Sequence, residues 1–347
     1  MAELSGVEKA LFKTIVYYNC LDYPLTLDEL EVFSFGVNSA HREISSNLDG
    51  LIKKKLIEKF SGFYFLRGRK NLVQEREEKN KIAKEKWKKI LKAARWLNII
   101  PYIKAVFASG SLAFDNTTKE SDLDVLIVVK SGRIWTSRFL TVILLGLLGV
   151  RRKRYQLLAP DKICLNHFIT DKSLYIPRKS IYTAQLYARL VSILLEDESL
   201  LDEFAKANSW VGGWVRGWPE TIKNQNAKIK MAYSARRLQS LWRRTTEATS
   251  AAKAGQNYNS KIKTLGEKIL NTKFGDWLEN ILRKYQLRRI NNFHLTYKAG
   301  GRVKADDESL EFHPDSPELR IIEKYNKTME KLEFPELGRE QDSGLLT

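Results

Sequence analysis

The sequence predicts an α+β protein in which a small mixed β-sheet core is flanked by helical regions on both sides. Three short apolar runs of strand length, at 103–108, 122–129 and 162–170, follow one another near the middle of the chain. Segments with apolar residues three and four positions apart, the spacing of amphipathic helices, precede and follow these runs. A chain of 347 residues is long enough for two or three domains with hydrophobic cores.

The composition is that of a soluble globular protein with a large positive charge. Hydrophobic residues make up 43% and charged residues 29% of the chain, while the net charge is +18 and the pI is near 9.6. This balance favours a polyanionic partner or substrate, such as DNA, RNA, a nucleotide or an anionic membrane surface, without choosing among them.

The sequence gives no sign of a disulfide framework, a zinc site or a membrane span. Cys20 and Cys164 are far apart and both lie in apolar stretches, which predicts buried thiols. The most apolar run, Phe139–Val150, is too short to cross a bilayer. No signal peptide is recognisable, so we expect a cytoplasmic protein without integral membrane association. The four histidines are scattered without the spacing of metal ligands: His41, His167, His294 and His313.

Residues 1–70 read as three helices followed by a β-hairpin. The helices are predicted at 6–20, at 27–33 after a capping box formed by Thr26 and Glu29, and along a third segment ending near 53. Two strand-like runs then surround Ser61 and Gly62.

This order resembles a winged helix-turn-helix domain. The resemblance would make the third helix a recognition element and the hairpin a wing. The residues expected to contact nucleic acid are Arg42, Ser45, Ser46, Lys53, Arg67, Arg69 and Lys70. Several acidic residues dilute this basic face, and such domains also serve as protein–protein adaptors, so binding of a protein partner is the alternative.

The rest of the chain divides by composition. Residues 71–100 predict a long charged linker helix, which is solvated at first and packed on the next domain towards its end. Residues 101–175 hold the predicted sheet core, and residues 176–335 predict a helical substrate or acceptor domain before a polar tail at 336–347. Within the helical domain we expect helices at 182–196, 199–207, 226–247, 259–287 and 316–332, and a flexible basic turn at 297–304.

The most informative stretch lies in the core. The run 103–108 ends in Gly110-Ser111, ten residues follow, and Asp122 and Asp124 then open the second run. Alternation along a strand places Asp122 and Asp124 on one face, with Leu123 facing the core. Two carboxylates at this spacing suit a hard cation such as Mg²⁺ that also holds phosphates.

Gly110-Ser111 followed by Asp122-Leu123-Asp124 is similar to the signature of the polymerase-beta-like nucleotidyltransferase superfamily, and in particular to its minimal prokaryotic members. Ser121 strengthens the likeness, because small members often have Ser-Asp-x-Asp. The resemblance implies that Gly110, Ser111 and Ser121 bind the nucleotide, ATP included. It also implies that Asp122 and Asp124 bind Mg²⁺ or Mn²⁺.

The third catalytic carboxylate of this superfamily would fall in the run 162–170, where this chain has Asn166. An asparagine offers a neutral carbonyl oxygen to a metal but cannot act as a general base near neutral pH. His167 and Asp171 are nearby substitutes, although His167 should face the other side of the strand. An ordinary buried amide is the alternative reading of Asn166.

Two functions remain open after these observations. The first is a magnesium-dependent nucleotidyltransferase that moves a nucleoside monophosphate from a nucleoside triphosphate to a hydroxyl of an acceptor, with nucleic acid favoured, and releases pyrophosphate. Arg133 and Arg138 are candidates for a triphosphate clamp in this enzyme, although surface solubility explains them equally well. The alternative is a catalytically degenerate, nucleotide-sensing and DNA-binding regulator.

Overall fold

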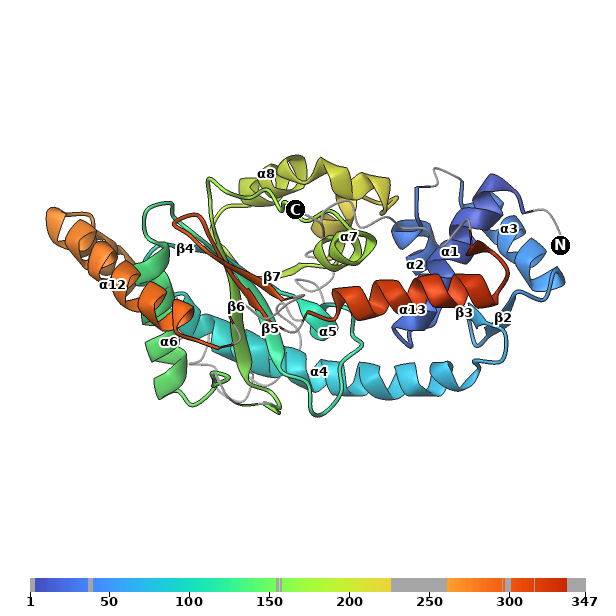
Figure 1. Cartoon of the computed structure of the whole chain (residues 1–347), viewed down its shortest axis with the longest axis horizontal. Coiled ribbons are helices and arrows are strands. Elements are labelled where there is room, and N and C mark those ends of the chain that lie inside the picture. The colour runs from blue at the N-terminus through green and yellow to red at the C-terminus, as the bar shows by residue number, and fades with distance from the viewer. Residues whose placement is uncertain are drawn as a thin grey trace, which may run out of the picture.

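A six-stranded mixed β-sheet forms the centre of the protein in the computed structural model, which describes residues 4–36, 40–153, 156, 158–225, 261–294, 296, 301–314 and 316–335 (Figure 1). Its strands lie in the order β7-β4-β5-β6-β9-β8. Only β5 and β6 are parallel, and the other neighbours are antiparallel. The strands are β4 (Ile103–Ala108), β5 (Leu123–Val129), β6 (Ile163–Thr170), β7 (Val191–Leu195), β8 (Arg302–Ala305) and β9 (Ser309–His313).

Both faces of the sheet are buried, because apolar residues occupy both alternating sets of positions in β4 and β5. One set, which includes Val106, Val125 and Ile127, packs with residues of helices α4, α6 and α12. The other set, which includes Phe107 and Leu126, packs with α7, α8, α13 and the N-terminal helices. The helices around the sheet are α4 (Asn71–Leu97), α6 (Ile134–Leu147), α7 (Ile181–Ala188), α8 (Ser199–Ala207), α12 (Lys273–Asn291) and α13 (Glu318–Lys331).

The N-terminal elements closely follow the sequence prediction. Helices α1 (Gly6–Cys20), α2 (Leu27–Phe33) and α3 (His41–Lys53) precede a small sheet in the order β1-β3-β2. The predicted capping box is present, since Thr26 accepts from the Glu29 amide and Glu29 accepts from the Thr26 amide. The strands are β1 (Leu25–Thr26), β2 (Ile57–Phe60) and β3 (Phe63–Leu66).

The helical domain expected at 176–335 also contains three strands, β7, β8 and β9, that the sequence analysis did not predict. The expected helix 182–196 ends early, and Val191–Leu195 instead pairs with the edge of β4. β-branched Val191 and Ile193 suit a strand, and pairing satisfies backbone groups that the β4 edge would leave open. Likewise, Arg302–Ala305 is a strand rather than a flexible turn, and it pairs with β9.

The remaining C-terminal predictions have mixed outcomes. The expected helices 199–207 and 316–332 are present as α8 and α13. The expected helix 259–287 is interrupted at 271–272, before α12, and the expected helix 226–247 lies outside the described residues. A short 3₁₀ helix, η1 (Ser209–Gly213), follows α8. No described helix is both long and apolar enough to cross a membrane.

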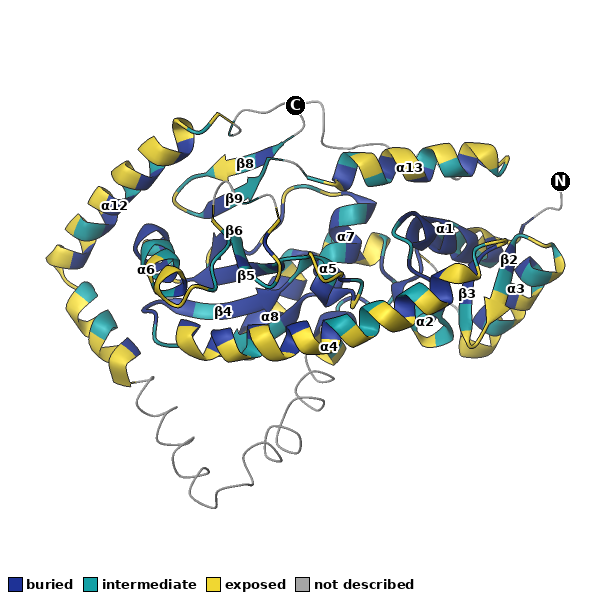
Figure 2. Ribbon diagram, turned by 90° about the horizontal axis from the view of Figure 1, so that it is seen from below, coloured by how far each residue is buried: buried dark blue, intermediate teal, exposed yellow. Residues whose placement is uncertain are grey.

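The long helix α4 runs along both the N-terminal elements and the sheet (Figure 2). Its charged residues are mostly exposed, as the sequence predicts, but Arg76 and Lys86 are buried. Lys86 Nζ donates to the Ser121 carbonyl oxygen at 2.7 Å and pairs with Asp161 at 2.9 Å. The prediction that the first half of α4 is solvated therefore needs a correction, because Arg76 in this half is buried. Each half of the helix contains one buried charged residue that contacts a neighbouring part of the fold.

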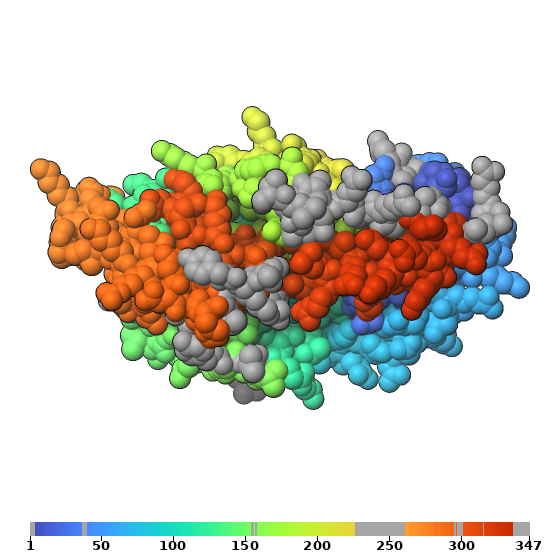
Figure 3. Space-filling model, in the orientation of Figure 1, coloured from blue at the N-terminus to red at the C-terminus, as the bar shows by residue number. Residues whose placement is uncertain are grey.

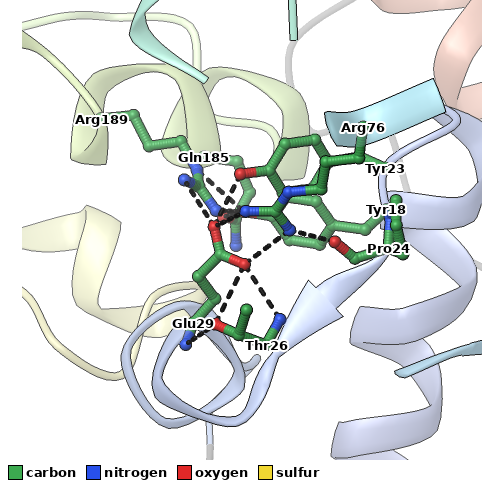
Figure 4. A network of polar contacts seen from close by, with 8 residues as sticks. All are labelled: Tyr18, Tyr23, Pro24, Thr26, Glu29, Arg76, Gln185 and Arg189. Atoms are coloured by element: carbon green, nitrogen blue, oxygen red, sulfur yellow. Dashed lines mark hydrogen bonds and ion pairs between the residues drawn. The ribbon is translucent and has the colours of Figure 1, made fainter. Parts of the chain in front are cut away.

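Arg76 belongs to a buried polar network centred on Glu29 (Figure 4). Its guanidinium donates to both Glu29 oxygens, at 2.7 and 2.8 Å, and Arg189 at the end of α7 lies 3.9 Å from the same carboxylate. Arg189 also donates to the hydroxyl of Tyr18 on α1. Glu29 thus connects α2, α4 and α7. Burial would raise the pKa of Glu29, but Arg76, Arg189 and the Thr26 amide outweigh it and lower this pKa to about 2.

We expect Glu29→Ala to destabilise the protein by about 3–5 kcal/mol, because it leaves Arg76 and Arg189 buried beside each other without their shared carboxylate. The free energy of unfolding, measured in urea, checks this value. Because the folded-state pKa of Glu29 lies below its unfolded value, its contribution is complete above about pH 4.3 and is lost as the pH falls towards the folded pKa.

Asp28→Ala is the matched control, since Asp28 is the exposed neighbour of Glu29 in the first turn of α2. We expect this variant to lose no more than about 1 kcal/mol, the usual size of a carboxylate's interaction with a helix N-terminus. An equal decrease in the free energy of unfolding in Glu29→Ala and Asp28→Ala would contradict the assigned role of Glu29.

Candidate functional site

The turn from β4 into α5 (Gly110–Ala113) approaches the start of β5 closely. Gly110 has a φ of +60°, and a Cβ atom at this position would lie only 2.4 Å from Oδ2 of Asp124. The amide of Ser109 also donates to the Asp124 carbonyl oxygen at 3.0 Å. Only glycine therefore meets both requirements, the positive φ and the contact with the carboxylate.

Asp122 and Asp124 project from the start of β5 on the same side, while Leu123 between them is buried. Oδ2 of Asp122 lies 2.6 Å from Nη1 of Arg152, and Oδ1 of Asp124 accepts a hydrogen bond of 2.8 Å from the Asn166 amide. The Cys164 thiol on β6 completes a cluster whose oxygen and sulfur atoms all lie within 4.8 Å of one another.

The closeness of these groups changes their protonation. Burial and the neighbouring Asp122 carboxylate raise the pKa of Asp124 to about 7, against the lowering effects of Asn166 and Arg152. Burial and the same two carboxylates raise the pKa of the Cys164 thiol well above its ordinary value. Near neutral pH, the cluster thus contains a half-protonated Asp124 and a neutral thiol.

A β-bulge in β6 changes which residues reach this site. Asp124 pairs with Cys164 and Leu126 pairs with His167, so one extra residue of β6 lies between these pairs. As a result, both Asn166 and His167 line the cavity beside Asp124. The expectation that His167 faces away is therefore wrong, because strict alternation fails at the bulge.

A cavity of about 310 Å³ opens beside Asp124 and the Gly110 turn. Leu21 contributes from the N-terminal part, Tyr182 from α7, Arg302 and His313 from the β8–β9 hairpin, and Ile321 from α13. The volume is at the lower end for a small-molecule site. Figures 1 and 3 show that α13 runs along the surface from the sheet to the N-terminal elements, so the C-terminal segments form one wall of this site.

The predicted nucleotide-binding residues fall into two groups. Gly110 and Ser111 line the cavity, whereas Ser121 lies outside its lining and bonds to Thr118 in the preceding loop. Arg133 and Arg138 do not line it either. Arg133 pairs with Asp276 at 2.6 Å, and Arg138 donates to Gln286 at 2.6 Å, so both arginines contact α12 at a distance from the motif.

The predicted nucleic-acid-binding residues lie on α3 and around the β2–β3 hairpin. Most of them are exposed, whereas Ser45 and Arg69 are partly buried and Arg69 pairs with Asp22 at 2.7 Å. Lys70 lies over the ring of Phe60. The exposed members of the predicted set are Arg42, Ser46, Lys53, Arg67 and Lys70.

Four residues at or beside the site were not predicted from the sequence: Arg152, Cys164, Arg302 and His313. Arg152 belongs to a basic cluster that is visible in the sequence, but nothing there indicates which member reaches Asp122. Cys164 stands two positions before Asn166 in the same strand and thus on the same face, a spacing that could have indicated it. Arg302 and His313 reach the cavity only through the unpredicted β8–β9 hairpin.

Residues 87–181 match the family of nucleotidyltransferase domains. The matched segment contains the turn at Gly110, the Asp122 and Asp124 pair and strand β6. The match supports a nucleotidyltransferase domain, and hence a nucleotide substrate, for this part of the chain. No curated protein and no solved structure matches the chain.

Nucleotidyltransferase domains typically use divalent metals, and the acidic cluster fits such an ion in part. The Asp122 and Asp124 oxygens are hard ligands of the kind that Mg²⁺ or Mn²⁺ prefers, whereas a thiol suits softer metals. Arg152 already supplies a positive charge to Asp122. A metal at this position would therefore be held by the two carboxylates and would compete with the guanidinium.

We expect Asp124→Asn to raise stability above neutral pH. The folded-state pKa of about 7 lies above the unfolded value, so the Asp124 contribution is favourable at low pH and is lost as the pH rises to the folded pKa. The variant should thus be more stable than the wild type by a few kcal/mol at about pH 8 and nearly equal at about pH 4. Urea unfolding at several pH values measures this difference, and Asp49→Asn, at an exposed position of α3, is the control.

We expect Arg152→Ala to increase the affinity for Mn²⁺ by roughly tenfold, the factor that about 1.4 kcal/mol of competing ion-pair energy produces. Titration with Mn²⁺, followed by electron paramagnetic resonance of the free ion, gives the dissociation constant. Lys153→Ala removes the next, exposed charge and is the control for a general change in potential. An unchanged constant in Arg152→Ala would show that the guanidinium does not compete with the metal.

Proposed function

We propose that the protein is a divalent-metal-dependent nucleotidyltransferase that moves a nucleoside monophosphate from a nucleoside triphosphate to an acceptor hydroxyl. The observation that supports this proposal best is the geometry within the matched segment. Asp124 contacts the glycine turn and lines a cavity together with Ser111, and Asp122 places a carboxylate oxygen within 4.8 Å of the Asp124 carboxylate. Mg²⁺ or Mn²⁺ is the proposed metal.

The reaction requires the acceptor oxygen to form a bond to the α-phosphorus while the bond to the β-phosphate bridging oxygen breaks. The hydroxyl proton is lost and pyrophosphate carries away the leaving electron pair. In the proposed site, the backbone at Gly110 and Ser111 holds the phosphates, and Asp122 and Asp124 would hold the metal, which offsets phosphate charge.

We propose a nucleic acid as the acceptor, for which the net charge of +18 is the main support. In this proposal the N-terminal three helices and hairpin act as a winged helix. Arg42, Lys53 and Arg67 would contact phosphates there, since all three are exposed. A protein that binds to this surface is the alternative partner.

One observation favours a second candidate function, a nucleotide-sensing regulator without turnover. Asn166 stands where a third carboxylate is expected, and its amide donates to Asp124. Among the described residues, the third member of the acidic cluster is the Cys164 thiol, which burial keeps protonated. A site with two carboxylates and a neutral thiol can bind a metal nucleotide and still lack the charge needed for rapid transfer.

The deciding experiment is incubation with each α-labelled nucleoside triphosphate and Mg²⁺, in the presence of total RNA, DNA or protein. We expect the wild type to transfer label and Asp122→Ala/Asp124→Ala to reduce transfer by about 10³-fold or more, as expected when transition-state charge stabilisation is removed. The matched control is Asp306→Ala, at a carboxylate on the β8–β9 connection outside the cavity.

The acceptor that carries the label identifies the substrate class. Nucleotide binding that depends on Mg²⁺, without transfer to any acceptor, would instead support the regulator and contradict the enzyme. Retention of DNA by the full chain, and its loss in Arg42→Ala/Lys53→Ala, would then be the next measurement.

A further inference from the structure

A second group of metal-ligating side chains lies beside the acidic cluster, and two of its members line the cavity. His167, Glu311 and His313 place one ligand atom each within 4.8 Å of one another. The register of the sheet explains this meeting. His167 of β6 pairs directly with Glu311 of β9, and His313 follows two positions later on β9, so the three side chains share one face.

We propose that His167, Glu311 and His313 form a binding site for a transition-metal ion of the Zn²⁺ class. Two imidazoles and one carboxylate are a ligand set that Zn²⁺ accepts and that Mg²⁺ disfavours. Both histidines line the cavity, so a fourth coordination position would face the cavity and could take water or a phosphate oxygen. The site differs from the acidic cluster in both its residues and the metal that it prefers.

The surroundings of the histidines support this assignment. The hydroxyl of Tyr187 lies 3.2 Å from Nδ1 of His167, which orients the ring and leaves Nε2 for a ligand.

A metal ion at this site would have to share Glu311 with Arg302, because Nη2 of Arg302 lies 2.7 Å from Oε1 of Glu311. Its other nitrogen, Nη1, lies 3.2 Å from Oε2 of Glu318, a carboxylate that is almost completely buried. Arg302 thus keeps a counter-ion of its own. A carboxylate with two oxygens can bridge a guanidinium and a metal, so Glu311 can serve both partners.

Asn166 connects the two sites. Its amide nitrogen donates to Asp124 at 2.8 Å and lies 3.4 Å from Nδ1 of His313. A metal at the histidines would therefore stand one side chain away from the acidic cluster. We infer that this ion binds an anionic group of whatever occupies the cavity. The metal site itself does not depend on the proposed transfer activity.

The test measures Zn²⁺ binding by equilibrium dialysis and Co²⁺ binding by visible absorption, with excess Mg²⁺ present throughout. The wild type should bind a single ion that Mg²⁺ does not displace. His313→Gln and Glu311→Gln should each weaken binding by about 100-fold or more, because each removes a direct ligand. His294→Gln, at an exposed histidine of the same C-terminal region, is the matched control.

Cys164→Ser tests whether the ion binds to the acidic cluster instead, and this variant should leave Zn²⁺ and Co²⁺ binding unchanged. Circular dichroism identifies any variant that does not fold, and the partly exposed Glu311 and His313 avoid the risk of altering the buried His167. Binding that persists in both His313→Gln and Glu311→Gln, binding lost in Cys164→Ser, or no binding by the wild type would overturn the proposal.

Discussion

Two carboxylates held side by side at the start of a buried strand need positive charge or protons close by, and the site is built around that requirement. Asp122 meets it with Arg152, and Asp124 meets it in part with the Asn166 amide and in part by keeping a proton up to neutral pH. The positive φ of Gly110 allows the turn to contact the same carboxylate. Residues from α5, β5, β6 and the segment before β6 thus depend on one electrostatic constraint.

The sequence predicted the parts of this arrangement that local rules determine. The helix of residues 6–20, the capping box at Thr26 and the placing of Asp122 and Asp124 on one strand face all follow from spacing along the chain. The strand β7 did not follow, because Val191–Leu195 fits either a buried helix or a strand and only the edge of β4 decides between them.

Long-range pairing explains what sequence reasoning missed in the site. His313 and Arg302 reach the cavity because β9 pairs with β6 more than a hundred residues away in the chain. The bulge in β6 turns His167 towards the cavity, and no spacing rule signals that bulge. Composition likewise did not distinguish the buried Arg76 and Lys86 from the exposed charges of the same helix.

The carboxylate of Glu29 has a consequence for the motions of the protein. Helices α2, α4 and α7 meet at this group, and the N-terminal helices share one apolar core with a face of the central sheet. Opening α2 alone would expose two buried guanidinium groups, so amide hydrogens of α2 and α7 should exchange with solvent only in openings that involve both helices. We therefore expect the N-terminal elements and the central sheet to unfold as one cooperative unit.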